Sequence, residues 1–109
     1  INRGILTTIY ADLKMDATVS DLKKMAEDFY AGEEFVRIIE GNESAEIRWI
    51  KGSNYFDMNV FKDNRTKKLI ITSALDNLVK GAAGQAIQNM NLMFGLEENT
   101  GLTDLGVFP

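Results

Sequence analysis

The sequence of 109 residues contains no cysteine, no histidine and a single proline. The missing cysteine excludes a disulfide scaffold, an all-thiolate zinc site and a cysteine nucleophile within this chain. The missing histidine removes the commonest general base and the commonest metal ligand, so we expect no metal site. No apolar run approaches the roughly 18 residues of a membrane-spanning helix, and we expect neither a membrane partner nor a signal peptide.

An excess of positive charge is also missing. The chain has 12 basic and 16 acidic residues, a net charge of −4, whereas nucleic-acid binders usually carry an excess of Lys and Arg. Hydrophobic residues make up 45% and charged residues 26%, which is typical of one globular domain spanning residues 1–109. The chain starts at Ile1 in a strand-like run and ends on an apolar tail, so we interpret it as part of a larger protein.

The first half of the sequence predicts a strand, a helix and a second strand. Residues 4–13 are rich in β-branched and aromatic side chains, and because both faces are apolar we expect a central strand or one paired at an interface. An amphipathic helix is predicted from Thr18, capped with Asp21 and ended near Gly32, with its apolar stripe on a sheet. Residues 35–39 predict a strand parallel to the first.

The second half predicts a hairpin and a long helix. Residues 41–53 are interpreted as a loop with a short extended piece, and 55–61 with 68–74 as a β-hairpin. The hairpin turn carries a basic cluster. We interpret these charges as solvated side chains at the tip of the hairpin, which discourage pairing of sheet edges, in preference to an anion-binding site. The cluster comprises Lys62, Arg65, Lys67 and Lys68. The fold class is therefore α+β: a β-α-β-β-β portion over 1–77, forming a mixed sheet of about four strands with helices on one side, and a helix over 78–95.

The last predicted helix is unusual because no charged residue lies between Lys80 and Glu97. Opposite its apolar stripe it carries Gln85, Gln88, Asn89 and Leu92. Neutral amides can be buried if they are hydrogen-bonded. We expect its apolar stripe to lie on its own sheet and its other side to be covered from outside this chain; simple exposure of the amides is the alternative.

The start of this helix contains two glycines, Gly81 and Gly84. Glycine in a helix costs about 1 kcal/mol relative to alanine. Close approach of a backbone or a ligand is a usual reason for accepting that cost, and the free N–H groups of a helix start favour an anion or a carbonyl oxygen. Tight helix packing is the alternative interpretation.

Three segments, in this order along the chain, carry a resemblance to one enzyme family. They are residues 2–10 (NRGILTTIY), which contain an Arg-Gly-Ile-Leu strand, residues 51–55 (KGSNY) followed by Asp57, and residues 76–95 (DNLVKGAAGQAIQNMNLMFG). Together they resemble the N-acetyl-gamma-glutamyl-phosphate reductases, and the third segment, which is similar to the C-terminal signature of that family, is the most specific.

The resemblance implies an enzyme of arginine biosynthesis in the cytoplasm, which reduces N-acetyl-γ-glutamyl phosphate to the semialdehyde with NADP(H). The family uses a cysteine thiolate, a histidine and a glycine-rich Rossmann domain, all absent from this chain. We therefore expect no catalytic residue here and no activity from this chain alone. The domain is expected to resemble the C-terminal domain of glyceraldehyde-3-phosphate dehydrogenase, in a homo-oligomer, dimer or tetramer, with the 78–95 helix packed toward the nucleotide-binding domain.

The resemblance also implies site residues. Those expected at the cofactor are Gly81, Ala82, Gly84 and Gln85. The three small residues would allow close approach, and Gln85 would hydrogen-bond the nicotinamide end, while a domain outside this chain would hold most of the NADP(H). Arg3 is expected to bind a substrate carboxylate or phosphate, with a structural salt bridge as the alternative. Ser53 and Asn54 either face the site or form a turn.

Two other functions remain open. A free-standing dimerisation or interaction domain would explain the apolar hairpin and the two-sided apolar first strand. An aspartate-semialdehyde dehydrogenase-type relative would share the same domain and differ in its substrate, although residues 81–88 favour the acetylglutamyl enzyme.

Overall fold

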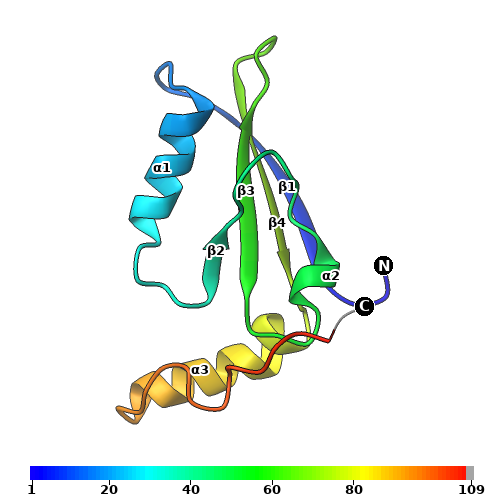
Figure 1. Cartoon of the computed structure of the whole chain (residues 1–109), viewed down its shortest axis with the longest axis vertical. Coiled ribbons are helices and arrows are strands. Elements are labelled where there is room, and N and C mark those ends of the chain that lie inside the picture. The colour runs from blue at the N-terminus through cyan, green and yellow to red at the C-terminus, as the bar shows by residue number, and fades with distance from the viewer. Residues whose placement is uncertain (108–109) are drawn as a thin grey trace.

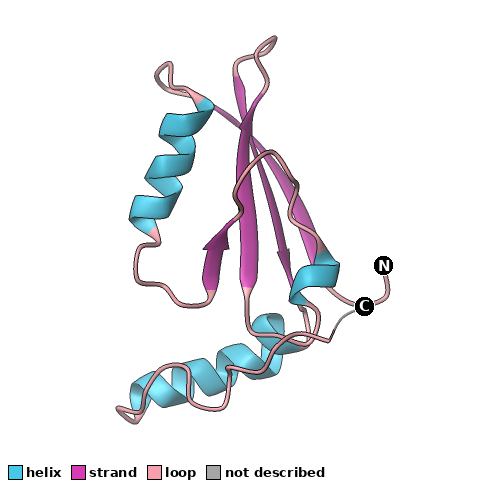
Figure 2. Cartoon of the chain, viewed as in Figure 1, coloured by secondary structure: helices cyan, strands magenta, loops and turns pink. Residues whose placement is uncertain are grey.

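The computed structural model describes residues 1–107, and the end of the apolar tail, residues 108 and 109, lies outside this range. The elements are β1 (Ile5–Asp12), α1 (Val19–Phe29), β2 (Val36–Ile38), α2 (Ile47–Ile50), β3 (Phe56–Lys62), β4 (Lys68–Leu75), a π-helical turn η1 (Val79–Ala83) and α3 (Gly84–Met93). The strands form one twisted sheet in the order β1-β4-β3-β2, with α3 beneath its lower end (Figures 1 and 2). β2 and β3 are parallel and the other pairs antiparallel, which confirms the four-stranded mixed sheet.

Strand β1 lies at an edge of the sheet, so its interpretation as a central strand is wrong for the described residues. It pairs with β4, from Ile5 opposite Leu75 onward, and no strand lies on its other side among residues 1–107. Its apolar side chains are exposed on both faces, Ile9 on one and Tyr10 on the other. β1 does run parallel to β2 as predicted, although β4 and β3 lie between them.

Helix α1 begins with the predicted capping box. The Thr18 hydroxyl accepts a hydrogen bond from the Asp21 amide (3.1 Å), and the Asp21 carboxylate accepts one from the Thr18 amide (3.0 Å). Past the helix end Gly32 has a positive φ of 89°, which suits the predicted left-handed cap region. The helix lies against β2 and β3, but none of its residues is buried and Phe29 is 79% exposed, so the sheet covers its stripe only in part.

The predicted placement of helices on one side of the sheet holds for α1 and not for α2. Lys62, which shares a face with Met58 and Val60 by strand alternation, binds Asp16 and the Ala17 carbonyl just before α1. The loop leading into α2 covers the opposite face. There the Ala45 amide donates to Thr72 Oγ1, and Ala45 and Ile50 pack with Ala74. Both faces of the sheet are thus partly covered within this chain.

The basic hairpin cluster is also divided by these contacts. The Lys62 side chain is only 8% exposed and pairs with Asp16, and Lys68 pairs with Asp12 (2.6 Å in each case). Lys62 therefore does not belong to a solvated tip. Because β3 and β4 are the two interior strands, the charges at their turn protect no sheet edge, contrary to our interpretation.

The segment predicted to contain a short extended piece forms the single turn α2 instead. Ile47 and Trp49 alternate with Arg48, which suggested a strand. The fully buried residue is Ile50, three positions after Ile47, and it joins the core cluster around Ala74. Helical spacing therefore governs burial here, and a run of four residues is too short for periodicity to distinguish the two structures.

Helix α3 packs through its polar side, so the expectation that its apolar stripe lies on its own sheet is wrong. Its buried residues are Gly84, Gln88 and Asn91. The Asn91 amide donates to the carbonyls of Glu98 and Thr100 (3.0 Å each), which fixes the following segment along the helix. The apolar side chains Ile87, Met90, Met93 and Phe94 are exposed. Within residues 1–107, no helix is both long and apolar enough to cross a membrane.

Candidate functional site

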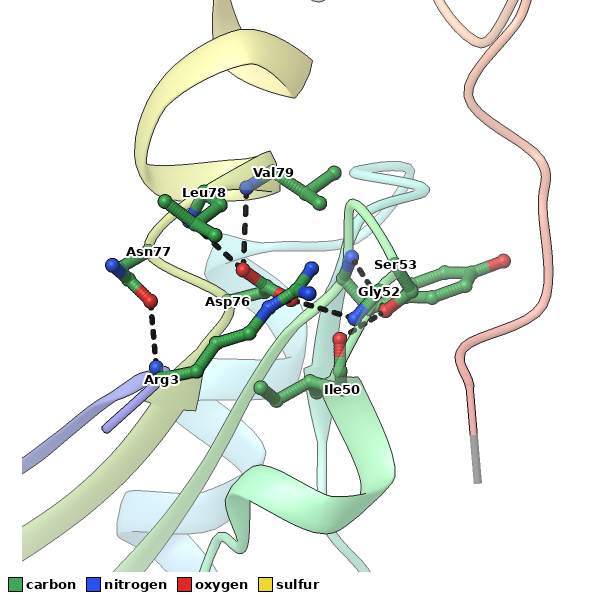
Figure 3. A network of polar contacts seen from close by, with 10 residues as sticks. Arg3, Ile50, Gly52, Ser53, Asp76, Asn77, Leu78 and Val79 are labelled. Atoms are coloured by element: carbon green, nitrogen blue, oxygen red, sulfur yellow. Dashed lines mark hydrogen bonds and ion pairs between the residues drawn. The ribbon is translucent and has the colours of Figure 1, made fainter. Parts of the chain in front are cut away.

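One buried carboxylate joins three segments at the lower end of the sheet (Figure 3). Asp76 follows β4 and is 0% exposed. Its Oδ2 accepts hydrogen bonds from Arg3 Nε (2.9 Å) and the Gly52 amide (2.6 Å), and its Oδ1 accepts one from the Leu78 amide (2.8 Å). Asp76 therefore ties the start of β1 and the loop after α2 to the start of η1.

The electrostatics of this junction favour the charged carboxylate. Burial by itself raises the pKa of Asp76, but hydrogen bonds from Arg3 and from the Gly52 and Leu78 amides outweigh it and hold the pKa below its ordinary value of 3.8. The guanidinium of Arg3 lies 2.8 Å from the same oxygen. Arg3 is thus in the structural ion pair that we gave as the alternative to substrate binding. Its side chain remains 35% exposed, and a substrate contact stays a prediction.

The turn that follows carries the residues predicted at the cofactor. In η1 the Gly81 amide donates to the Asp76 carbonyl (2.9 Å) and the Ala83 amide to the Leu78 carbonyl (3.2 Å), the i to i+5 pattern of a π turn. Gly81 and Ala82 are exposed. The structure brings Gly81, Ala82, Gly84 and Gln85 together over this turn and the first turn of α3.

The two glycines differ in what surrounds them. A Cβ at Gly84 would collide with Asn54 Oδ1 and lie 2.8 Å from Val79 Cγ1, so packing within this chain explains this glycine. A Cβ at Gly81 would meet Leu75 Cδ1 at 3.2 Å and nothing closer. Gly81 is therefore the glycine whose presence packing inside the chain does not require.

A cluster of polar side chains lies behind this turn. Gln88 Oε1 accepts hydrogen bonds from Lys80 Nζ (2.6 Å) and Asn54 Nδ2 (3.0 Å), and Gln88 Nε2 donates to Glu98 Oε1 (2.6 Å). The Lys80 ammonium lies 5.4 Å from the ring centroid of Phe35. Burial lowers the pKa of Lys80, and the charge of Glu98 partly offsets this.

Sequence reasoning missed the role of Asp76, and for Asn54 it left open whether the side chain faces the site or forms a turn. Asp76 precedes a helical run and accepts from the amides two and three positions later, which is the start signal of a capped helix and was available from the sequence. Asn54 is 34 residues from Gln88, and no local pattern reveals such a pair. Ser53 donates to the Ile50 carbonyl (2.8 Å) in a turn, the second interpretation that we gave for it.

Gln85 is half-buried, and its Nε2 donates to Asn89 Oδ1 (3.0 Å). Among residues 1–107 there is no group of three His, Cys, Asp or Glu side chains placed to hold a metal ion. The candidate site thus consists of backbone and small or neutral side chains on η1 and the start of α3. Hydrogen bonds to the buried side chains of Asp76 and Gln88 hold this backbone in place.

A model of the family described as "Semialdehyde dehydrogenase, dimerisation domain" matches residues 1–77. The chain belongs to this family. The semialdehyde dehydrogenase dimerisation domain agrees with the α+β fold and with the expected resemblance to the C-terminal domain of glyceraldehyde-3-phosphate dehydrogenase. Its description also supports self-association, although it names no surface.

Curated relatives extend the similarity beyond this domain to α3 and the segment after it. The chain is 51% identical over 109 residues to an N-acetyl-gamma-glutamyl-phosphate reductase of Lachnospira eligens, and 50% identical over 109 residues to one of Lachnoclostridium phytofermentans. The alignments cover 100% of this chain and 31% and 32% of those proteins. The chain thus spans about a third of the length of the curated relatives that it matches.

Proposed function

We propose that this chain is part of an NADP-dependent reductase that converts N-acetyl-γ-glutamyl phosphate to N-acetylglutamate semialdehyde in arginine biosynthesis. The observation that supports this most strongly is the identity of about half of all residues, over the whole chain, to proteins of that name. The reaction would proceed through a cysteine thioester formed outside this chain, since the chain has no cysteine. The protein would act in the cytoplasm.

The residues of the candidate site fit a cofactor that approaches from the exposed side of η1. NADP(H) supplies the hydride in such a reaction. Gly81 and Ala82 leave the backbone of the π turn accessible, and within residues 1–107 the nearest atom to a Cβ at position 81 is the flexible end of the Leu75 side chain, 3.2 Å away. We assign Gly81, Ala82 and Gln85 to cofactor contacts, and Gly84 to the close packing on Asn54 that holds this backbone in place.

Arg3 could contact an anionic substrate only with the part of its guanidinium that does not bind Asp76. Two of its nitrogens already engage Asp76 Oδ2. The buried carboxylate would then hold Arg3 in one orientation, which suits the binding of a planar carboxylate or a phosphate.

The exposed apolar stripe of α3 is proposed to pack toward the nucleotide-binding domain. The stripe defined by Ile87, Met90, Met93 and Phe94 is only partly covered within residues 1–107, and Met93 and Phe94 are mostly exposed. It replaces the amide face as the surface that we expect another domain to cover. The sheet portion, 1–77, would then be left for contacts in a dimer or tetramer.

The first test compares the complete protein with this chain alone. We expect the complete protein to oxidise NADPH in the presence of N-acetyl-γ-glutamyl phosphate and the isolated chain to show no turnover, because it lacks nucleophile and general base. NADPH consumption at 340 nm measures both. Turnover by the isolated chain would contradict the assignment. A complete protein that prefers aspartyl phosphate would identify the aspartate-semialdehyde type, and self-association without turnover would favour the non-catalytic dimerisation domain.

The second test addresses the cofactor contact at Gly81. In the complete protein, Gly81→Ala should raise the KM for NADPH about tenfold, the effect of about 1.4 kcal/mol of lost binding free energy. The added methyl group would lie 3.2 Å from Leu75 Cδ1, a contact that a small shift of this flexible side chain relieves, and it would add bulk to a turn whose backbone is exposed. Steady-state kinetics with NADPH varied measures the change. Lys24→Ala on the exposed face of α1 is the control, and an unchanged KM in Gly81→Ala would contradict the assignment.

A further inference from the structure

We propose that Lys80 is a positioning residue, which holds the π turn η1 in the conformation that the cofactor contacts require by bonding Gln88 two turns away. This inference rests on the proposed function, because it concerns the same NADP(H) contacts at Gly81 and Ala82. Lys80 itself is placed behind the turn and touches no cofactor in this assignment.

The geometry of the π turn brings the two side chains together. Gln88 lies eight positions after Lys80, and in a regular helix of 3.6 residues per turn this offset places the two side chains about 80° apart around the axis. A π turn accommodates one extra residue, so the pair is spaced as positions i and i+7 of an α-helix, which share a face. The bond from Lys80 Nζ to Gln88 Oε1 (2.6 Å) therefore connects the π turn to α3, and the π turn brings the two side chains onto one line.

Gln88 is a fixed partner for this bond. Its oxygen also accepts from Asn54 (3.0 Å) and its nitrogen donates to Glu98 (2.6 Å), so both ends of the amide are held. Gln88 is only 8% exposed and Asn54 1%. The ring of Phe35, itself 2% exposed, lies near the ammonium and limits where it can move.

Within η1, Lys80 is the residue whose side chain can make such a bond. The other four members of the turn are Val79, Gly81, Ala82 and Ala83, and their side chains carry no hydrogen-bonding group. Backbone bonds to Asp76 and Leu78 hold the turn at its start, and the Lys80–Gln88 bond connects it to the body of α3. Loss of this connection would let the backbone around Gly81 relax toward a regular helix.

The test uses the complete protein with Lys80→Met, Lys80→Arg and, as a matched control on an exposed helix face, Lys24→Met. Lys80→Met should raise the KM for NADPH about tenfold, as expected for one lost hydrogen bond to a charged group, with kcat within about twofold. Lys80→Arg should restore most of the binding, and Lys24→Met should match the wild type. Hydrogen exchange should be faster at the amides of Gly81 and Ala83 in Lys80→Met.

Unchanged exchange at these amides in Lys80→Met would overturn the proposal, and so would faster exchange with an unchanged KM for NADPH. A fall in kcat with unchanged KM would also overturn it, because it would place Lys80 in the chemistry. If the wild-type protein consumes no NADPH, the proposed function fails, while the exchange measurement still decides whether Lys80 holds the turn.

Discussion

Asp76→Asn is expected to lower the free energy of unfolding by about 3 kcal/mol at pH 7, as for other buried ion pairs that lose one partner. Both carboxylate oxygens accept hydrogen bonds from donors: Arg3 and Gly52 at Oδ2, and Leu78 and Val79 at Oδ1. The asparagine side chain has one oxygen and one NH₂ group, so its NH₂ group must face the donors at either the Oδ1 or the Oδ2 position. The substitution therefore removes a charge and creates a clash of donors in a site with no exposure.

Urea denaturation followed by the fluorescence of Trp49, the single tryptophan, measures this loss. Two controls separate its causes. Arg3→Ala leaves the backbone donors on Asp76 and should cost less, about 1–2 kcal/mol. Asp28→Asn disrupts the exposed pair with Lys24 and should change stability by less than about 0.5 kcal/mol. Equal effects of Asp76→Asn and Asp28→Asn would contradict the role of the junction.

The same substitution has a predictable pH dependence. The folded-state pKa of Asp76 lies below its ordinary value of 3.8, so its contribution to stability is present above that value and is lost as the pH falls through the folded-state pKa. The difference in stability between the wild type and Asp76→Asn should therefore be full at pH 7 and shrink below about pH 4. Asp16, Asp21 and Asp63 also have lowered pKa values, but they are present in both proteins and cancel in the difference.

Gly84→Ala is expected to destabilise the protein by about 2 kcal/mol, although alanine favours helices by about 1 kcal/mol over glycine. The new methyl group would collide with Asn54 Oδ1 and lie 2.9 Å from the Val79 carbonyl oxygen. Asn54 cannot easily move aside, because it is buried and its amide nitrogen is bonded to Gln88. The thermal unfolding midpoint and urea denaturation both measure the effect.

Gly81→Ala is the matched control for this second stability prediction. It adds the same methyl group three residues earlier, where the nearest atom is Leu75 Cδ1 at the flexible end of a side chain, 3.2 Å away. We expect its stability to stay within about 1 kcal/mol of the wild type. If the two substitutions were equally destabilising, helix propensity or local strain would explain both, and the contact with Asn54 would not matter.

The parts of the fold that were predicted correctly depend on local signals. The capping box of Thr18 and Asp21, the turn near Gly32 and the β-hairpin are each encoded within a few residues of one another. The family resemblance also rested on contiguous segments, and the match over residues 1–77 agrees with it.

The parts that were missed depend on contacts between distant segments. The edge position of β1 is set by its pairing with β4, which lies about 60 residues later in the chain. The residue types of a strand indicate that it is a strand, but they do not indicate whether one or two other strands pair with it. The uncharged face of α3 was expected to be covered from outside this chain. Of its four residues only Gln88 is buried, and the cover there comes from the chain's own Asn54 and Glu98, whereas Asn89 and Leu92 are exposed. Of the candidate site, the sequence indicated the segment of η1 and the start of α3 and left the role of Asn54 open. The structure added Asp76 and Lys80 as supports of the turn and bonded Asn54 to Gln88.

The open edge of β1 has a consequence for handling the chain. Residues 5–10 (ILTTIY) contain no charge and no proline, and proteins usually protect exposed sheet edges with such residues. The ion pair of Asp12 with Lys68 lies only at the far end of the strand. Short uncharged segments of high β-propensity readily recruit identical copies into intermolecular sheets. We therefore expect the chain by itself to add strands at this edge and to precipitate in concentrated solution, and Thr8→Lys to reduce both.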